Sequence, residues 1–515
     1  MKTKKTIKSR LSAFVILALA ASASQATLVE LAEYQDWEAL QASIASEDVN
    51  ETQADGMTAL FWATYYDQTD VVRSLLNAGA SANISNRYGM TPLIQAAKNG
   101  NGEVISMLLD AGADPNATTL EGDNAILNAS KTGSVRGVQA LIEAGANVNS
   151  MDGYLFQTPI MWAAAANQAA VVEILIDNGA DIDTRSPVLE LRGIRQGGVA
   201  GDFPDGGLTA LHHAARENAI EATRVLIDRG ANLDVLEPKY DVSPLRMAII
   251  NANLDLAKML IESGANFNDG ALVDLLDVVT NKMVFVRAEK NYLNQTSPVD
   301  LMGLMFDMGV DVDAYPEKSY PVVSTNFVGG GGTSGRTALF NAASHQNQEM
   351  VALLLEHGAN PNSINDGGRQ GGRFLPLTAA LGLVQTGTEL QERYAQEEGF
   401  NITESARLLI ENGADFNAQA DDGSTVLHHA VGLGNEDVVT YLIENGADLS
   451  LKDTSNRTAL DLANGVPMVN QGDDEPAELP VYEEIATLLT EAMNAQGIAI
   501  EEYMAPESDS ESGEA

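Results

Sequence analysis

A short motif, Gly-Ala-Asp/Asn-x-Asn/Asp or a close variant, recurs along most of the chain and constrains its fold more than any other feature. Its copies begin at Gly79, Gly112, Gly145, Gly179, Gly230, Gly264, Gly309, Gly358, Gly413 and Gly446. Successive copies lie 33, 33, 34, 51, 34, 45, 49, 55 and 33 residues apart. A period near 33 residues indicates an array of small structural units, with insertions wherever the step is longer.

Each copy of the motif closes a segment with the pattern of two amphipathic helices, and residues 91–116 are the most regular example. Thr91 is a good N-cap, and Pro92 suits the first helical position because its missing N–H has no partner there anyway. The second helix carries a stripe of apolar residues, namely Val104, Ile105, Leu108 and Leu109. Helices of about eight residues are not stable alone, so the units must stack on one another.

A second motif, Thr-Pro/Ala-Leu-x-x-Ala, keeps the same phase upstream of the first. It begins at Thr58, Thr91, Thr158, Thr209, Thr337, Thr425 and Thr458, with weaker matches at Asn124, Ser243 and Leu375. The two motifs together make the chain, over about residues 28–492, resemble the ankyrin-repeat family. More narrowly, it resembles exported bacterial ankyrin-repeat proteins that have long inserts between repeats.

The resemblance implies an all-α solenoid. Each unit would consist of a β-turn finger, an inner helix, a short turn and an outer helix. Partners would bind the concave face made of fingers and inner helices, since proteins of this class are mostly binding scaffolds.

We expect about twelve units, including degenerate caps at both ends. Residues 28–50 form the N-terminal cap, in which Trp37 should pack on the next unit. Regular repeats occupy 58–183, 209–268 and 337–362; irregular ones with inserts occupy 271–313 and 363–417; and 425–493 holds the last repeats and a cap. Residues 184–207 and 314–335 are expected to be long Gly-containing fingers, and 501–515 an acidic disordered tail.

The first 26 residues have the pattern of a cleavable secretory signal. They contain five basic and no acidic residues, then an apolar run over 11–21 that is too short to span a bilayer, then small residues suited to cleavage. We therefore predict a periplasmic or secreted protein without a membrane span after signal removal. An uncleaved anchor is the alternative.

The net charge of −42 argues against nucleic acid or an anionic membrane as a partner. It is consistent with solubility alone or with capture of a basic protein partner. The chain has no cysteine, which excludes disulfides and thiolate metal sites.

The sequence carries no catalytic signature, and we predict neither enzyme activity nor a cofactor or metal. The resemblance implies a structural hydrogen-bonding role for His212 and His428, which occupy the His position of Thr-Pro-Leu-His-x-Ala. The glycine run 329–332 lacks the lysine of a phosphate-binding loop. An enzyme with a site built from the inserts at 185–207, 314–335 and 366–374 is a remaining alternative.

One column of side chains, the residue after the His position in each unit, should face the concavity. It comprises Trp62, Gln95, Asn128, Trp162, His213, Met247, Asn341 and His429. Exposed aromatic residues are frequent binding hot spots. We predict that the partner contacts Trp62, Tyr65, Tyr66, Gln95, Asn128, Trp162 and His213, with the fingers at 192–205 and 322–332 extending the site. The alternative is that the aromatic rings pack on neighbouring helices or fingers.

These features predict a non-enzymatic protein–protein interaction scaffold, exported, that binds a protein on its concave face. An exported effector or adhesion factor that engages a host protein is the alternative. A monomer is the simplest expectation, although no sequence feature sets the oligomeric state.

Overall fold

The computed structural model describes residues 26–188, 206–280, 294–317, 335–366, 373–383, 403–467, 479–501 and 503. Contacts divide the chain into two compact units. The first unit contains residues up to 187 together with 209–214 and 219–231. The second contains 188–208, 215–218 and everything from 232 onward. Most of the predicted inserts, the predicted signal and most of the acidic tail lie outside the described residues.

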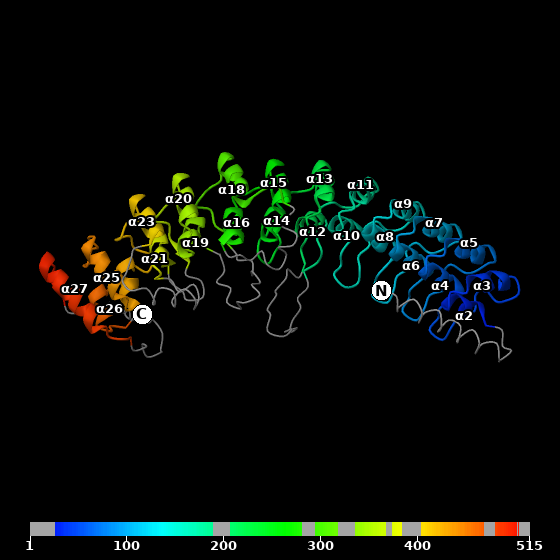
Figure 1. Cartoon of the computed structure of the whole chain (residues 1–515), viewed down its shortest axis with the longest axis horizontal. Helices are drawn as coiled ribbons and strands as arrows, with labels where there is room; N and C mark the ends of the chain where they lie inside the picture. The colour runs from blue at the N-terminus through cyan, green and yellow to red at the C-terminus, as the bar shows by residue number, and fades with distance from the viewer. Residues whose placement is uncertain are drawn as a thin grey trace, which may run out of the picture. The chain divides into compact units, whose positions relative to one another are not determined.

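The first unit is a stack of antiparallel helix pairs (Figure 1). Its helices are α2 (Leu28–Glu33), α3 (Trp37–Ser43), α4 (Ala59–Tyr65), α5 (Thr69–Asn77), α6 (Pro92–Asn99), α7 (Gly102–Asp110), α8 (Ala125–Thr132), α9 (Val135–Glu143), α10 (Pro159–Ala165), α11 (Ala169–Asp177) and α13 (Ile220–Asp228). The inner helices α4, α6, α8 and α10 form one row, and the outer helices α5, α7, α9 and α11 form the other. Helix α12 (Ala210–Glu217) contributes residues to both units.

The second unit repeats this arrangement. Its elements are α14 (Pro244–Ile250), α15 (Leu254–Glu262), α16 (Ala271–Thr280), α18 (Pro298–Asp307), α19 (Ala338–Ser344), α20 (Gln348–Glu356), β1 (Asn365–Asp366), β2 (Arg373–Phe374), α21 (Pro376–Ala380), α23 (Glu404–Glu411), α24 (Val426–Gly432), α25 (Glu436–Glu444), α26 (Ala459–Ala463) and α27 (Glu483–Gln496). The predicted helix pairing in the irregular repeats is confirmed, because α16 packs on α18 and α21 on α23. The sequence did not predict the two-residue antiparallel ladder of β1 and β2.

Local chemistry explains where the helices begin and end. The hydroxyl of Thr91 accepts a hydrogen bond from the Ile94 N–H at 3.2 Å, which confirms its predicted role as N-cap. The carboxamide oxygen of Asn124 does the same for Leu127 at 3.1 Å. Gly112, which follows helix α7, adopts a φ of +82°, a conformation that residues with a side chain rarely take.

The last asparagine of the repeated motif joins each unit to the next. The side-chain amides of Asn83, Asn116 and Asn149 donate to the carbonyls of Gly112, Gly145 and Gly179, at 2.8, 2.9 and 3.1 Å. Their carboxamide oxygens accept from the backbone N–H two residues beyond each of those glycines, at 2.8, 2.9 and 3.1 Å. These bonds satisfy backbone groups that follow the outer helices, so the motif encodes the stacking as well as the turn.

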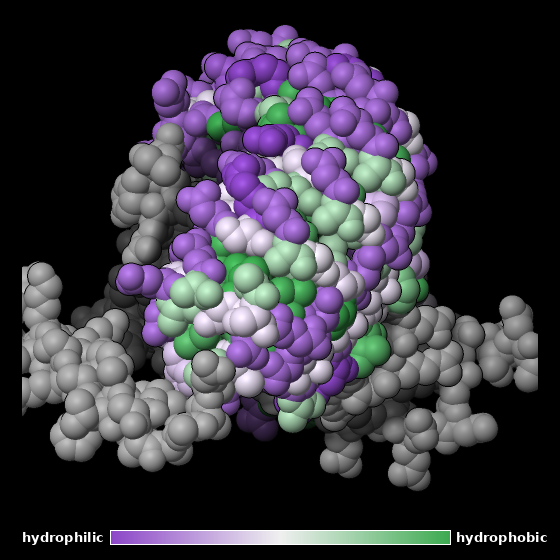
Figure 2. All heavy atoms as spheres, turned by 90° about the vertical axis from the view of Figure 1, so that its right-hand side faces the viewer, coloured by the Kyte–Doolittle hydropathy of each residue, from purple (hydrophilic) through white to green (hydrophobic). Residues whose placement is uncertain are grey.

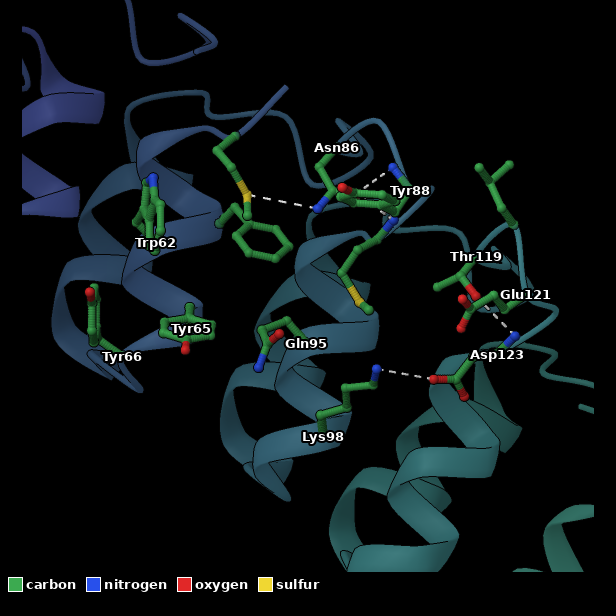
Figure 3. A pocket seen from close by; sticks show the side chains of 14 residues that line it. Trp62, Tyr65, Tyr66, Asn86, Tyr88, Gln95, Lys98, Thr119, Glu121 and Asp123 are labelled. Atoms are coloured by element: carbon green, nitrogen blue, oxygen red, sulfur yellow. Dashed lines mark hydrogen bonds and ion pairs between the residues drawn. The ribbon is translucent and has the colours of Figure 1, made fainter. Parts of the chain in front are cut away.

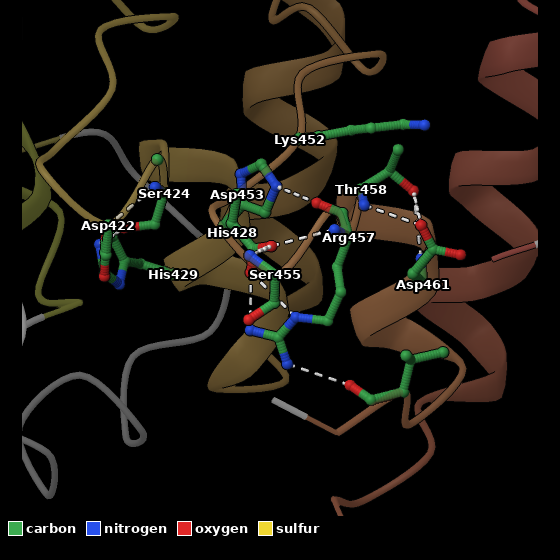
Figure 4. A network of polar contacts seen from close by, with 12 residues as sticks. Asp422, Ser424, His428, His429, Lys452, Asp453, Ser455, Arg457, Thr458 and Asp461 are labelled. Atoms are coloured by element: carbon green, nitrogen blue, oxygen red, sulfur yellow. Dashed lines mark hydrogen bonds and ion pairs between the residues drawn. The ribbon is translucent and has the colours of Figure 1, made fainter. Parts of the chain in front are cut away.

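The predicted structural role of the two histidines is confirmed. Nδ1 of His212 lies 2.9 Å from the Thr209 hydroxyl, and Nδ1 of His428 lies 2.8 Å from the Thr425 hydroxyl. Nε2 of His428 also lies 3.2 Å from the Arg457 carbonyl oxygen (Figure 4). Burial lowers the pKa of His428, so the neutral ring is favoured in the folded protein.

Two of the ion pairs among the described residues of the second unit are buried. The Arg457 guanidinium is within 2.9 Å of Asp453 and donates to the Val466 carbonyl at 3.0 Å (Figure 4). Arg246, whose side chain is only 1% exposed, contacts Asp274 at 2.6 Å and the Asp241 carbonyl at 3.2 Å. Such groups are stable inside a protein only when they are paired and hydrogen-bonded.

Asp269 adds a second carboxylate beside Arg246. One of its oxygens accepts from the Ser243 hydroxyl at 2.8 Å, and the other is buried without a hydrogen-bond partner among the described residues. Burial raises the pKa of Asp269 to about 6, although Arg246 and the Ser243 hydroxyl oppose that rise.

We predict that Asp269→Asn stabilises the second unit at neutral pH. A carboxyl whose pKa is higher in the folded than in the unfolded state stabilises the fold at low pH, and that contribution disappears as the pH rises through 6. The gain at pH 8 should be on the order of 2–3 kcal/mol, because the pKa differs by about two units. In urea unfolding, the difference between variant and parent should be about 1 kcal/mol smaller at pH 5 than at pH 8. A difference that is the same at both pH values would contradict the prediction.

Candidate protein-binding groove in the N-terminal repeats

A groove of about 670 Å³ lies in the first unit, on the face formed by the inner helices and the fingers that precede them. We call this the inner-helix face. Helices α4 and α6 form one side of the groove, and the fingers at residues 86–90 and 119–123 form the other (Figure 3). Four residues of the predicted site line it, namely Trp62, Tyr65, Tyr66 and Gln95. Sequence reasoning placed these four on one face, and the structure brings them together.

Trp62, Tyr65 and Tyr66 form a compact aromatic cluster at one end of the groove. Trp62 stacks on Tyr66 with ring centroids 5.8 Å apart, and it meets Tyr65 edge to face at 5.6 Å. Tyr65 and Tyr66 meet at 5.1 Å, and Trp37 of the N-terminal cap contacts Tyr66 at 5.9 Å, as predicted. Mutual packing therefore fixes the rings, yet half of Tyr65 is still exposed.

The finger at residues 86–90 is folded by Asn86. Its carboxamide oxygen accepts from the backbone N–H groups of Tyr88 and Met90, both at 3.0 Å (Figure 3). The Tyr88 carbonyl in turn accepts from the N–H of Leu120 on the next finger at 3.0 Å. Tyr88 and Leu120 thus lie on neighbouring backbones, and the two residues are 56% and 80% exposed. Sequence reasoning missed both, although a spacing near the repeat period could have found them.

Polar side chains line the end of the groove opposite the aromatic cluster. Lys98 of α6 forms an ion pair with Asp123 at 3.2 Å. Asp123 also accepts from the side chain of Asn128 at 2.7 Å, so Asn128 contacts the rim but does not line the groove. Glu121, between Leu120 and Asp123, is exposed.

Two other predicted site residues do not line the groove: Trp162 contacts side chains of neighbouring segments, and His213 is buried. The Trp162 indole donates to Asp152 at 3.0 Å, and the Lys131 ammonium lies 4.2 Å from the ring centroid, so the partly exposed Trp162 already contacts a neighbouring finger and helix. The prediction that His213 faces a partner is wrong, because this side chain is only 1% exposed. Helical phase predicts the face on which a residue lies, but neighbouring segments decide what covers that face. Met247 and Asn341, in the same column, are buried as well.

A serine, a histidine and an aspartate lie close together in the second unit, as in a catalytic triad; they are Ser424, His429 and Asp422 (Figure 4). The Ser424 hydroxyl donates to Asp422 at 2.5 Å and lies 3.0 Å from Nε2 of His429. In a catalytic triad the histidine lies between the serine and the carboxylate, whereas here the serine lies between the other two. Asp422 also accepts from the Ser424 N–H at 2.9 Å, so the arrangement folds a finger turn.

The described residues contain no group of three or more His, Asp or Glu side chains that could hold a metal ion. Within the same residues, no helix is both long and apolar enough to cross a membrane.

The first unit as a whole is acidic. Residues 26–187 include 21 acidic and 6 basic side chains. Figure 2 views the end of the first unit that carries α2 and α3, where hydrophilic residues cover much of the surface and hydrophobic residues gather in smaller groups among them.

Comparison with known families identifies the class of protein. A family model of three ankyrin repeats matches residues 19–119, 117–186, 194–271 and 393–470, and a single-repeat model matches 334–366. These matches cover more than half of the chain, which therefore belongs to the ankyrin-repeat family, a class of protein–protein interaction scaffolds.

Curated relatives share moderate identity. The chain is 25% identical to the E3 ubiquitin-protein ligase KEG of Arabidopsis thaliana, over 60% of this chain and 18% of that protein. It is 27% identical to the ankyrin repeat and KH domain-containing protein mask-1 of Caenorhabditis elegans, over 55% of this chain and 10% of that protein. It is 25% identical to the human ankyrin repeat and SOCS box protein 6, over 41% of this chain and 45% of that protein. The chain thus spans less than half of the length of these relatives.

Among solved structures, the human ASB11 ankyrin repeat domain matches 42% of this chain and 90% of its own length, with a TM-score of 0.36 and 23% identity.

We predict that Gly153→Ala destabilises the finger that contains this glycine and disturbs the groove. A Cβ atom at Gly153 would collide with the backbone carbonyl of Glu121, which lies on the finger that lines the groove. Backbone cannot rotate aside as a side chain can, so the fingers must separate, at about 1–3 kcal/mol. Thermal unfolding should show the loss, and hydrogen exchange should place it at residues 119–123.

Gly112→Ala is the control for that prediction. Gly112, unlike Gly153, has a positive φ, and nothing lies within 4 Å of a Cβ atom there. Gly112→Ala should lower the free energy of unfolding only by the backbone strain, about 1–2 kcal/mol. It should not speed hydrogen exchange at residues 119–123. Equal exchange in the two variants would contradict the proposed collision.

Proposed function

We propose that this chain is an exported scaffold that binds a protein partner at the groove on its inner-helix face. The observation that carries the proposal is the aromatic cluster of Trp62, Tyr65 and Tyr66, which packing holds in place while Tyr65 stays half exposed. Interface hot spots are enriched in Trp and Tyr, and rigid aromatic side chains lose little conformational entropy on binding.

The chemistry of the groove also favours binding over catalysis. Among the described residues that line it there is no histidine, serine or cysteine. The Thr119 hydroxyl, which does line the groove, accepts a hydrogen bond from the backbone N–H of Asp123 at 3.0 Å and so helps to fold the finger. The ankyrin-repeat family match supports the same class of function.

A photo-crosslinking amino acid at position 95 tests the site. Gln95 lies on α6 in the groove, whereas Asn77 lies exposed at the end of the outer helix α5. We expect p-benzoylphenylalanine at 95 to form a specific adduct in the native cells, and the same group at 77 to form none. Mass spectrometry then identifies the crosslinked segment. Equal adducts at both positions, or an adduct at 77 alone, would exclude the inner-helix face as the binding site.

Export is tested independently by the mass of the mature N-terminus. Cleavage of the predicted signal should leave a chain that begins close to residue 27, found in the periplasm or the medium. Recovery of the intact chain from the cytoplasm would contradict this part of the proposal and leave the groove untouched. The distribution between periplasm and medium separates a periplasmic scaffold from a secreted effector.

A further inference from the structure

We propose that the groove receives an extended polypeptide segment in which a lysine or arginine is flanked by apolar residues. This inference rests on the proposed function and adds the chemistry of the partner. The basic side chain would lie over the Tyr65 ring, Glu121 at the other end of the groove would attract it electrostatically, and its apolar neighbours would lie on the exposed finger tips.

The aromatic cluster offers a site for a cation that the chain itself does not fill. Aromatic faces attract ammonium and guanidinium groups within about 6 Å of the ring centroid. On the same inner-helix face, Lys131 lies 4.2 Å from the Trp162 ring, and Arg87 lies 4.9 Å from the Tyr88 ring. Among the described residues, the cation–π contacts do not include Trp62, Tyr65 or Tyr66.

The charges that line the groove favour a basic ligand. The chain's own ammonium there, Lys98, is directed to Asp123 at 3.2 Å (Figure 3). Glu121 is exposed and forms no ion pair within the described part of the chain. One carboxylate of the groove is thus left for an incoming cation. The 21 acidic and 6 basic side chains of residues 26–187 would attract a positively charged segment over a longer range.

The finger tips supply an apolar rim beside these charges. Tyr88, Leu120 and Tyr154 occupy three consecutive fingers, and both Leu120 and Tyr154 are 80% exposed. The fingers are in backbone contact, since the Leu120 N–H donates to the Tyr88 carbonyl and a Cβ atom at Gly122 would lie 2.6 Å from the Gly153 nitrogen. A row of apolar side chains along adjacent backbones fits an extended chain better than a compact surface loop.

Synthetic peptides test this proposal on the mature full-length chain. The probes are four blocked peptides with the core Leu-Thr-X-Val-Leu, in which X is lysine, arginine, glutamine or glutamate. Binding is followed by calorimetry. We expect the lysine and arginine peptides to bind about tenfold more tightly than the glutamine peptide, which corresponds to about 1.4 kcal/mol. The glutamate peptide should bind most weakly. In 0.5 M salt the affinities of the basic, glutamine and glutamate peptides should become more similar, because salt screens the charges.

Variants connect the preference to the proposed residues. Glu121→Gln and Tyr65→Leu should each reduce the preference for lysine over glutamine at least threefold, whereas Tyr65→Phe should keep it because phenylalanine also has an aromatic face. Glu143→Gln is the matched control, because Glu143 is exposed on the outer helix α9 and the variant makes the same change in net charge. Circular dichroism melting confirms that each variant is folded.

Equal binding of the lysine and glutamine peptides, or failure of all four to bind at millimolar concentration, would overturn the inference. So would an unchanged preference in both Glu121→Gln and Tyr65→Leu. These outcomes are distinct from failure of the proposed function. A crosslinked partner at position 95 whose contact segment is acidic or wholly apolar would refute the basic ligand and leave the groove as the binding site. Binding of the basic peptides without any adduct at position 95 in cells would support the basic ligand and argue against the proposed function at the groove.

Discussion

Arg246→Leu should reduce the stability of the second unit by about 3–5 kcal/mol, the usual cost of leaving a buried charge without its partner. The substitution leaves Asp274, a buried carboxylate, without the guanidinium that it contacts at 2.6 Å. Asp269 nearby adds a second negative charge that Arg246 now partly offsets. Hydrogen exchange of α14 and α16, together with urea unfolding, measures the effect where it arises.

The double variant Arg246→Leu with Asp274→Leu is the control for this result. It removes both charges and should recover much of the lost stability, since well-packed apolar residues often replace a buried ion pair without loss. Destabilisation of the double variant equal to that of the single one would mean that shape, and not the uncompensated carboxylate, determines the cost. An Arg246→Leu variant as stable as the parent would contradict the role of the ion pair altogether.

Leu108→Ala should remove about 2–5 kcal/mol from the first unit and with it the groove. Leu108 is fully buried on the outer helix α7, which packs on α6 and on the neighbouring outer helices. In a repeat array each repeat is stabilised mainly by its neighbouring repeats. Loss of protection from hydrogen exchange should therefore spread from α7 to the adjacent helices and leave the second compact unit of the chain unaffected. Because Gln95 and Lys98 lie on α6, binding at the groove should weaken in parallel.

Leu109→Ala makes the same chemical change at the next residue of α7. Leu109 is only partly buried, so it should cost clearly less than Leu108→Ala. Hydrogen exchange resolved by helix distinguishes the two variants. Equal losses for Leu108 and Leu109, or a loss that extends to α19 and α24, would contradict a stack of locally stabilised repeats.

Most of the fold could be predicted because its signals are local. Thr91 caps a helix whose first N–H groups lie within three residues, and Gly112 ends one by its own backbone conformation. Both requirements recur with the repeat period and so can be recognised many times in one chain. The pairing of α16 with α18 could be predicted for the same reason, although that unit lacks the regular inner-helix motif.

The buried ion pair shows a signal that the sequence contained and that sequence reasoning missed. Arg246 stands at the position that His212 and His428 occupy in their units, directly after Ser243-Pro-Leu. This position is buried in every one of these three units. An arginine there needs a carboxylate close by, and the following inner helix supplies Asp274.

The candidate site was only half predictable. Helical phase brought Trp62 and Gln95 to one face, and it also indicated Trp162 and His213 for the same reason. Whether such a side chain is available depends on groups from other parts of the chain, such as Lys131 and Asp152 around Trp162. The finger residues of the groove were missed because turn positions have no helical period to mark them.

The sequence by itself thus determined the repeat, the helix boundaries and the face on which the aromatic column lies, because each depends on residues close together in the chain. Only the tertiary structure decided which members of that column stay exposed and that Tyr88, Leu120 and Glu121 join Tyr65 around one groove. The physical reason is that exposure and charge pairing are set by neighbours about one repeat away, as Lys98 of α6 and Asp123 of the next finger show.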